Sequence, residues 1–408
     1  MNKFMNLLNQ GFAPKAQKVA NNEWVLTIKN SILQVLPFIF VGSLITLLDI
    51  PENFFKWWPN LSPISSFTFG LTSIFVAFLL PYNVMEHKKL SNQKIIAGLS
   101  SVALFLMFAN PTWDKTSSII SYQFSELGAG GMFVALVVGG FVALIMEAFG
   151  KFSFFSKDTA LPDFIISWFD SMLPIVIVVG TGWLLSYVMH VDLYKIVQML
   201  LSPLSSSLDT WWGFTLILFL DCFIYSMGIS GWVLAGVESP IMFASIADNV
   251  TKFANGAQNL HIYTHEVIFS FPWIGGIGCT LPLVIIMLLW GKSKRTKALS
   301  KAVILPSIFN INEPVVFGII AWNPYLMVPL WINGLVLPLI TYFWLKMGLS
   351  PIPHSLMQMW YIPFPFVTWL VSPAISAIIL VLILFFVSGL IYYPFFKVYD
   401  NNLIQEEN

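Results

Sequence analysis

Two long stretches without charge constrain this chain more than any other feature of its sequence. No Asp, Glu, Lys or Arg occurs from Met347 to Phe396, and a second such run extends from Val315 to Leu345. Because a helix of about 20 apolar residues spans a bilayer, the first run can hold two membrane helices. The second run is too long for one helix and too short for two. Both runs predict a protein that lies within a membrane.

The overall composition excludes several other classes of protein. Only 10% of the 408 residues are charged and 57% are hydrophobic, whereas an ordinary soluble domain carries about 25% charged residues. A soluble enzyme, a disordered chain and a nucleic-acid binder are therefore excluded. The abundant aromatic residues lack the alternation of an outer-membrane barrel, which favours helices. Cys222 and Cys279 lie in apolar surroundings without metal-ligand spacing, so we expect neither a metal nor a cofactor.

The apolar runs predict an all-α polytopic membrane protein with about ten transmembrane helices, re-entrant hairpins and an interfacial amphipathic helix. The first run, 31–48, is long enough to span and precedes no small-residue cleavage site, so we expect it to remain as a membrane helix. Prolines interrupt the later runs, and broken segments are tolerated only where protein or a water-filled cavity covers them. That pattern is typical of a transport site. The further runs are 67–85, 95–112, 128–146, 171–189, 211–237 and 267–291.

The distribution of lysine and arginine predicts the orientation of the chain. Cations are frequent before the first run, after the second and fourth runs, in the loop 292–301 and after the last run, and are scarce in the loops between. The positive-inside rule then places both termini in the cytoplasm. We expect the amphipathic segment 158–171 to lie in the interface as a connector. We expect an N-terminal membrane domain at 1–157, followed by the interfacial helix and a connecting span at 158–200. A C-terminal transport domain would then occupy 201–396, with a cytoplasmic tail at 397–408.

Charged side chains inside apolar runs are costly in hydrocarbon and therefore candidates for function. Glu313 is the strongest of them, because it follows Asn310 and Asn312 where Pro306 and Pro314 break the helix. Broken helix ends leave free backbone donors and acceptors, which together with amides and a carboxylate suit a polyhydroxylated ligand such as a sugar. The alternative is a carboxylate that only caps backbone in a re-entrant turn. The other candidates are Asp221, Glu238, His265 and Glu266.

Several ordered segments resemble one protein family. The segment SIFNINEPVVFG around Glu313 is similar to the Asn-Glu-Pro motif of enzyme IIC, the membrane subunit of the lactose/cellobiose family of the sugar phosphotransferase system. MGISGWVLAGVESPIM resembles the Gly-Ile-His-Gly region of that family. FSFPWIGGIGCTLPL and MQMWYIPFPFVTWL resemble its Gly-Gly and Trp-x-x-Pro stretches. The order holds across residues 200–375, and length and hydropathy fit over the whole chain.

The resemblance implies a fold and a function. Members are homodimers in the bacterial plasma membrane with ten membrane helices, an N-terminal domain that forms the dimer contact and a C-terminal domain that holds the sugar. The sugar is phosphorylated from a phosphocysteine on a separate cytoplasmic subunit, enzyme IIB. The resemblance therefore implies a permease for a sugar such as the β-linked disaccharide cellobiose, with the lipid bilayer, the sugar and enzyme IIB as partners. Neither cysteine here has the polar setting of a phosphocarrier, so we expect no phosphorylated residue in this chain.

Site residues follow from the same resemblance. Glu313 corresponds to the motif glutamate that contacts the sugar near the hydroxyl to be phosphorylated, with Asn312 as its amide neighbour. Trp360 belongs to the late substrate-lining stretch, and the ring of Trp232 can pack on an apolar sugar face. We expect Trp273 to be a core residue instead. The complete set of predicted substrate-binding residues is Glu313, Asn312, Asn310, Ser230, His265, Glu266, Trp360, Trp232 and Asp221.

Departures from the family pattern leave other functions open. Ser230 stands where the family has a histidine, and Thr264-His265-Glu266 stands where it has Thr-Glu-Pro. A second hypothesis is therefore a sugar-binding facilitator, sensor or receptor that is not coupled to phosphorylation. A third is a membrane enzyme or proton-coupled carrier in which Asp221, Glu266 and Glu313 form a proton path. The simpler interpretations are that His265 is a surface-loop residue, that Asp221 is paired inside the bundle and that Glu238 lies in a turn.

Overall fold

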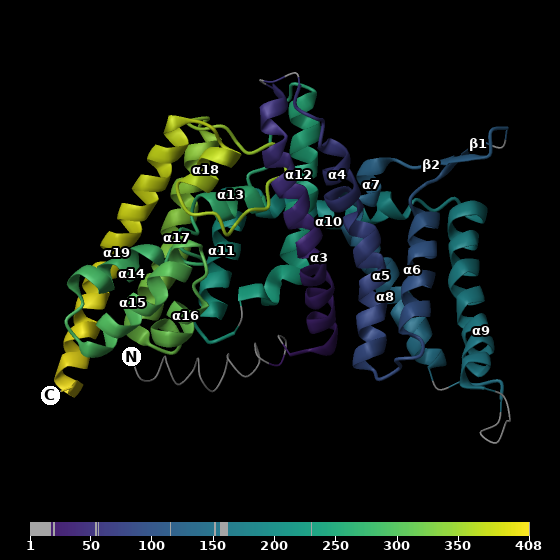
Figure 1. Ribbon diagram of the computed structural model, residues 1–408, viewed down its shortest axis with the longest axis horizontal. Helices are drawn as coiled ribbons and strands as arrows, with labels where there is room; N and C mark the ends of the chain where they lie inside the picture. Colours follow the sequence, from purple (N-terminus) through teal and green to yellow (C-terminus); the bar gives the residue numbers. More distant parts are fainter. Residues whose placement is uncertain are drawn as a thin grey trace. The chain divides into compact units, whose positions relative to one another are not determined.

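The computed structural model describes residues 18, 21–53, 55, 57–114, 116–150, 152–155, 162–229 and 231–407. It is predominantly helical, which confirms the predicted fold class (Figure 1). Within these residues five helices are long and apolar enough to cross a membrane, or six if one bent pair counts as a span. An exposed antiparallel hairpin of two short strands, β1 (Thr112–Asp114) and β2 (Ile119–Ser121), was not predicted.

The chain divides into two compact units. One contains residues 22–203 and 236–247, and the other contains 204–235 and 248–408. Two helices cross the divisions. These are α10 (Leu193–Leu208) and α12 (Ala235–Ala254).

In the N-terminal unit, α5 packs against α3, α6 and α8. Lys88 follows α5, and its Nζ lies 3.0 Å from Glu23 of α3 and 2.9 Å from Glu147 of α8. Lys88 therefore ties the ends of these three helices together. The helices of this unit are α3 (Glu23–Leu48), η2 (Ile50–Asn53), α4 (Ser62–Thr68), η3 (Phe69–Leu71), α5 (Thr72–His87), α6 (Lys94–Phe108), α7 (Phe124–Leu127), η4 (Ala129–Gly131), α8 (Met132–Phe149) and α9 (Asp163–Trp183).

Within the predicted interfacial connector, 158–171, the described residues 163–171 do not form a separate short helix. Residues 163–171 are the first part of the continuous helix α9, which is followed by a π-helical turn, η5 (Leu184–Val188). Together they form one of the candidate membrane spans, Ile165–Val188. Trp168 and Phe169 are 64% and 46% exposed, so apolar residues on this part of α9 face outward rather than forming a separate amphipathic helix.

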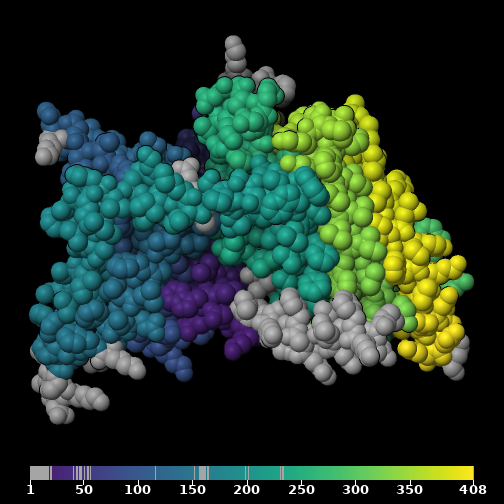
Figure 2. Space-filling view, turned by 180° about the vertical axis from the view of Figure 1, so that it is seen from behind, coloured from purple at the N-terminus to yellow at the C-terminus, as the bar shows by residue number. Residues whose placement is uncertain are grey.

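The C-terminal unit is built around α11, α17 and α19, in which α17 packs against the other two. Figure 2 shows the surfaces of α17 (light green) and α19 (yellow) running side by side. Several helices begin with a side-chain cap, such as Thr210 before α11 and Thr264 before α13. The helices are α11 (Trp211–Tyr225), η6 (Gly231–Leu234), α13 (His265–Ser270), α14 (Leu281–Trp290), α15 (Lys294–Ile308), α16 (Glu313–Val315), η7 (Val316–Ile320), α17 (Pro324–Lys346), α18 (Phe366–Val371) and α19 (Ile375–Glu407).

The charge-free run from Met347 to Phe396 does not hold two membrane helices. Only α19 is long, and the preceding part is irregular except for the short helix α18. Pro351, Pro353, Pro363 and Pro365 explain this, because proline lacks an amide donor and disfavours helix in the residue before it. The segment 350–365 instead forms a loop within the unit (Figure 1).

Tyr392 of α19 belongs to the core of the C-terminal unit. Its side chain is fully buried and its hydroxyl donates to the carbonyl of Gly278 at 2.9 Å. Only its neighbour Tyr393 is exposed, at 41%. The far end of α19 has a structural role as well, because Asp400 accepts hydrogen bonds from the amides of Lys292 and Ser293. This carboxylate therefore satisfies donors at the start of α15.

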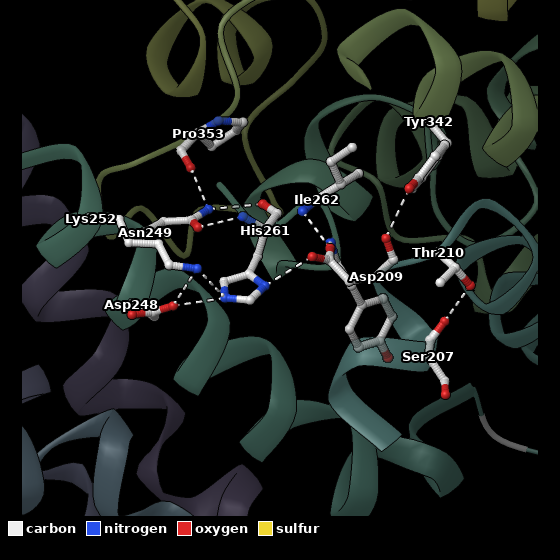
Figure 3. Close-up of polar contacts among 11 residues, drawn as sticks. Ser207, Asp209, Thr210, Asp248, Asn249, Lys252, His261, Ile262, Tyr342 and Pro353 are labelled. Carbon is white, nitrogen blue, oxygen red and sulfur yellow. Dashed lines mark hydrogen bonds and ion pairs between the residues drawn. The ribbon is translucent and has the colours of Figure 1, made fainter. Parts of the chain in front are cut away.

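A polar cluster around His261 joins several elements of the C-terminal unit (Figure 3). The two ring nitrogens of His261 lie 2.9 Å from Asp209 and 2.8 Å from Asp248. Lys252 pairs with the same Asp248 oxygen at 2.9 Å. Asn249 donates to the carbonyls of His261 and Pro353, so the cluster connects the end of α12 with two loops.

We expect this cluster to make the stability of the protein depend on pH. An imidazole with a carboxylate at each nitrogen is best satisfied when both nitrogens are protonated, and the hydrogen bond with Asp209 raises the pKa of His261 above 6.5. The raised pKa means that the folded state binds the proton more tightly than the unfolded state. The stabilisation is therefore complete below about pH 6.5 and is lost as pH rises through the folded-state pKa.

The measurement is the thermal unfolding temperature of wild type and His261→Gln between pH 5.5 and pH 9. The variant should be less stable at the acidic end, and the difference should shrink as the pH rises. His190→Asn, a change at an exposed histidine without a carboxylate partner in the described structure, should follow the wild-type profile. A constant difference across this range would contradict the interpretation.

Candidate functional site

The Asn-Glu-Pro segment lies between two broken helices of the C-terminal unit. Helix α15 ends at Ile308, and Asn310 adopts a left-handed backbone conformation with φ of 62°. Glu313 and Pro314 then start the single turn α16, which continues as the π-helical turn η7. Proline fits the first turn of a helix because its missing amide would have no helical partner there. The predicted break is therefore confirmed at Pro314, whereas Pro306 lies inside α15 near its end.

Glu313 is half-buried at this break. Among the residues that the structure describes, no side chain or amide forms a hydrogen bond or ion pair with its carboxylate. Tyr225, at the end of α11, lies close enough to interact with it electrostatically. Since buried carboxylates normally take up hydrogen bonds, this group retains its capacity to accept them from a ligand.

Asn310 is committed to the protein rather than to a ligand. Its side-chain oxygen accepts from the amide of Gly275 at 2.8 Å, and its nitrogen donates to the carbonyls of Trp360 at 2.7 Å and Ile362 at 2.9 Å. These bonds connect three segments that are far apart in sequence. The amide predicted to bind substrate thus holds the Trp360 loop and the Gly-Gly stretch beside the Asn-Glu-Pro segment.

Asn312 fastens the same region from the other side. Its side-chain nitrogen donates to the carbonyl of Ile277 at 2.9 Å and to the Thr280 hydroxyl at 3.1 Å, while its oxygen accepts from Tyr225 at 3.2 Å. Gly276 permits this contact, because a Cβ at that position would lie 2.4 Å from the Asn312 side chain. Gly276 also has φ of 98°, which favours glycine. The Gly-Gly stretch is therefore a close-packing element for the site.

His265 and Glu266 form the first turn of α13 and are both buried, which differs from the simple reading of His265 as a surface-loop residue. The His265 ring stacks on Phe269 with centroids 4.2 Å apart. Glu266 is 1% exposed, and one of its oxygens accepts from the Met357 amide at 3.0 Å and from Gln358 at 2.8 Å. Glu266 thus fastens the middle of the same loop that Asn310 holds near Trp360.

The predicted tryptophans occupy different environments. Trp360 is partly exposed on the loop held by Asn310, and its ring lies edge-on to Tyr361. Trp273 is 1% exposed, as expected for a core residue. Trp232 belongs to η6, but its side chain is not described, and Ser230 lies outside the described residues.

The remaining acidic candidates are buried within helices. Asp221 is 7% exposed in α11, one turn before Tyr225, and so belongs to the same unit as Glu313. Glu238 is 9% exposed inside α12 rather than in a turn, and it belongs to the N-terminal unit. The structure therefore gathers Glu313, Asn310, Asn312 and Trp360 into one neighbourhood through hydrogen bonds between their segments.

Sequence reasoning missed the aromatic residues that follow the motif. Trp322 donates its amide to the carbonyl of Ser226, and Trp331 donates its indole N–H to the Ser226 hydroxyl at 2.9 Å. Ser226 immediately follows Tyr225, which contacts Asn312. Proximity to the Asn-Glu-Pro motif was the only signal available in the sequence for Trp322.

Comparison with known proteins identifies the family of the chain. A family model described as "Phosphotransferase system, EIIC" matches residues 29–334. The lichenan permease IIC component of Bacillus subtilis strain 168 is 28% identical over all of this chain and 96% of its own length. The cellobiose-specific EIIC component of Geobacillus stearothermophilus is 27% identical, with the same coverage.

A solved structure shares the fold. The transporter ChbC, the IIC component of an N,N'-diacetylchitobiose-specific phosphotransferase system, superposes with a TM-score of 0.86 at 28% identity. The match covers 98% of this chain and 99% of ChbC. The ordered motifs, the helical membrane fold and the family model together show that this chain belongs to the EIIC family of phosphotransferase-system sugar permeases.

Proposed function

We propose that this protein binds a β-linked disaccharide such as cellobiose and carries it across the plasma membrane of a bacterium for phosphorylation by a separate enzyme IIB. The observation that carries the proposal is the Glu313 carboxylate, half-buried and unpaired within the described structure, at a helix break that Asn310 and Asn312 hold in place. The cellobiose and lichenan specificities of two relatives support a β-glucoside.

The geometry suits binding and phosphorylation of a hydroxyl group. An ionised Glu313 can accept a hydrogen bond from a sugar hydroxyl and orient its oxygen. When that oxygen attacks the phosphorus of a phosphocysteine on enzyme IIB, a new O–P bond forms and the S–P bond breaks. The carboxylate can take up the hydroxyl proton, and the thiolate leaves with the electron pair of the broken bond.

The other predicted residues divide into two groups under this proposal. We propose that Glu313 and Trp360 contact the sugar, and that Asn310, Asn312 and Glu266 shape the site through their bonds to the protein. Residues 1–157 would supply the contact of a homodimer, and both termini would lie in the cytoplasm. These assignments follow from the family resemblance and from the cation distribution.

The test uses membrane vesicles that contain the protein and are supplied with phosphoenolpyruvate, the soluble phosphocarriers and an enzyme IIB of the cellobiose type. We expect phosphorylated cellobiose to appear only when enzyme IIB is present. Accumulation of free sugar without the phosphocarriers would instead favour an uncoupled facilitator. Uptake that dissipates an imposed pH gradient would favour a proton-coupled carrier.

A further inference from the structure

Trp322 occupies an unusual backbone position close to the Asn-Glu-Pro motif. It follows the π-helical turn η7 and precedes α17, where its φ is 61°. A positive φ is uncommon for any residue with a side chain and is a clear outlier for a bulky one. Such conformations persist where surrounding contacts impose them, and they concentrate at functional sites.

The contacts that impose this conformation come from the broken end of α11. The Trp322 amide donates to the Ser226 carbonyl at 3.0 Å. Its indole nitrogen lies 3.4 Å from the point that a Cβ on Gly228 would occupy, and Gly228 itself has φ of 74°. The indole therefore lies against Gly228, just after the end of α11.

One side of the Trp322 indole is supported by the core. Met227 and Met327 are buried at 3% and 0% exposure, and Trp322 packs against them together with Phe223 and Trp331. Thioether groups make favourable contacts with aromatic rings. The indole itself remains partly exposed, and no partner binds its N–H group in the described part of the chain. A rigid aromatic surface with an available donor is thus presented beside the motif.

Tyr225 connects this surface to Asn312, the residue before Glu313. Its hydroxyl bonds to Asn312, its ring packs edge-on against Phe317 with centroids 5.6 Å apart, and the next residue is Ser226. Trp322 and Asn312, the residue before Glu313, are therefore hydrogen-bonded to adjacent residues, Ser226 and Tyr225, at one helix end. Aromatic faces pack well on the C–H faces of pyranose rings, while carboxylates bind their hydroxyl groups.

We propose that Trp322 is a specificity-determining residue, whose indole stacks on the apolar face of a pyranose ring while Glu313 binds its hydroxyl. This inference rests on the proposed sugar-binding function. In this chain Trp322 would supply recognition beside Ser226 and Gly228. Its ligand class is a β-linked glycoside whose ring presents a continuous C–H face.

The test measures the binding of cellobiose and lactose to the purified full-length protein by isothermal titration calorimetry. Trp322→Leu removes the aromatic face, and we expect affinity for the preferred sugar to fall about tenfold or more. Trp322→Phe keeps a ring but loses the indole donor, and its affinity should lie between wild type and the Leu variant. Trp344→Phe is the matched control, because this partly exposed tryptophan of α17 donates instead to Ser350.

Thermal unfolding of each variant shows whether the protein has folded, and only folded variants are compared. Equal affinity in wild type and folded Trp322→Leu would overturn the inference and would leave Trp322 as an interfacial anchor. If Trp322→Leu does not fold, the Trp322→Phe and Trp322→Tyr pair decides, and unchanged affinity in both would be the overturning result. Failure of wild type to bind either sugar, with no phosphorylation in vesicles, would instead reject the proposed function.

Discussion

Glu313→Gln is expected to abolish sugar binding and phosphorylation-coupled uptake, with a loss of about a hundredfold or more. The amide keeps the shape of the side chain but removes its charge and its capacity to accept a proton. Because no protein group pairs with Glu313 in the described structure, its replacement should leave the unfolding temperature nearly unchanged. Calorimetric titration with cellobiose and vesicle phosphorylation measure the first effect, and thermal unfolding measures the second.

Glu52→Gln provides the control for Glu313. This exposed glutamate belongs to η2 of the N-terminal unit, so its replacement should affect neither binding nor uptake. Wild-type sugar affinity in Glu313→Gln would show that the site lies elsewhere. A large drop in stability would show that the carboxylate caps backbone, which is the alternative considered from the sequence.

Asn310→Ala is expected to produce the largest loss of stability, about 2–4 kcal/mol. The substitution removes bonds to Gly275, Trp360 and Ile362 and leaves their polar groups buried. It also places alanine at a φ of 62°, which asparagine tolerates better. We expect a lower unfolding temperature and weaker sugar binding together, since the Trp360 loop loses its attachment.

Asn310→Asp separates the contributions of the side chain. Aspartate can still accept from the Gly275 amide but cannot donate to the carbonyls of Trp360 and Ile362. We expect a free energy of unfolding between those of wild type and Asn310→Ala, or below that of Asn310→Ala if these carbonyl oxygens repel the carboxylate. Asn92→Ala, at an exposed loop position, should unfold like wild type. A stability near wild type for Asn310→Ala would contradict the role of this residue as a clamp.

Much of the fold class could be predicted from hydropathy alone. Apolar segments such as 67–85 and 128–146 became parts of α5 and α8, because backbone polar groups in a membrane must be satisfied within helices. The failures have local causes. Hydropathy does not distinguish a loop enclosed by protein from a spanning helix, so it predicts a helix for the proline-rich segment after Met347, where the structure has a loop.

The candidate site could be predicted in part. The position of the break at Pro314 and the family of the chain follow from motifs in order along the sequence. The separate roles of Asn310 and Asn312 do not, because each depends on partners such as Gly275 and Ile277 that lie more than thirty positions away. A residue type indicates which bonds are possible and not which partner takes them.

The amino-acid sequence by itself determined the helical membrane class, the EIIC family and the location of a carboxylate at a break between helices. Only the tertiary structure decided that the neighbouring amides are occupied by the protein while Glu313 is not, and that Trp322 lies against Gly228. The reason is physical. Hydropathy and helix breaking depend on short stretches of chain, whereas the saturation of a polar group depends on atoms brought together by folding.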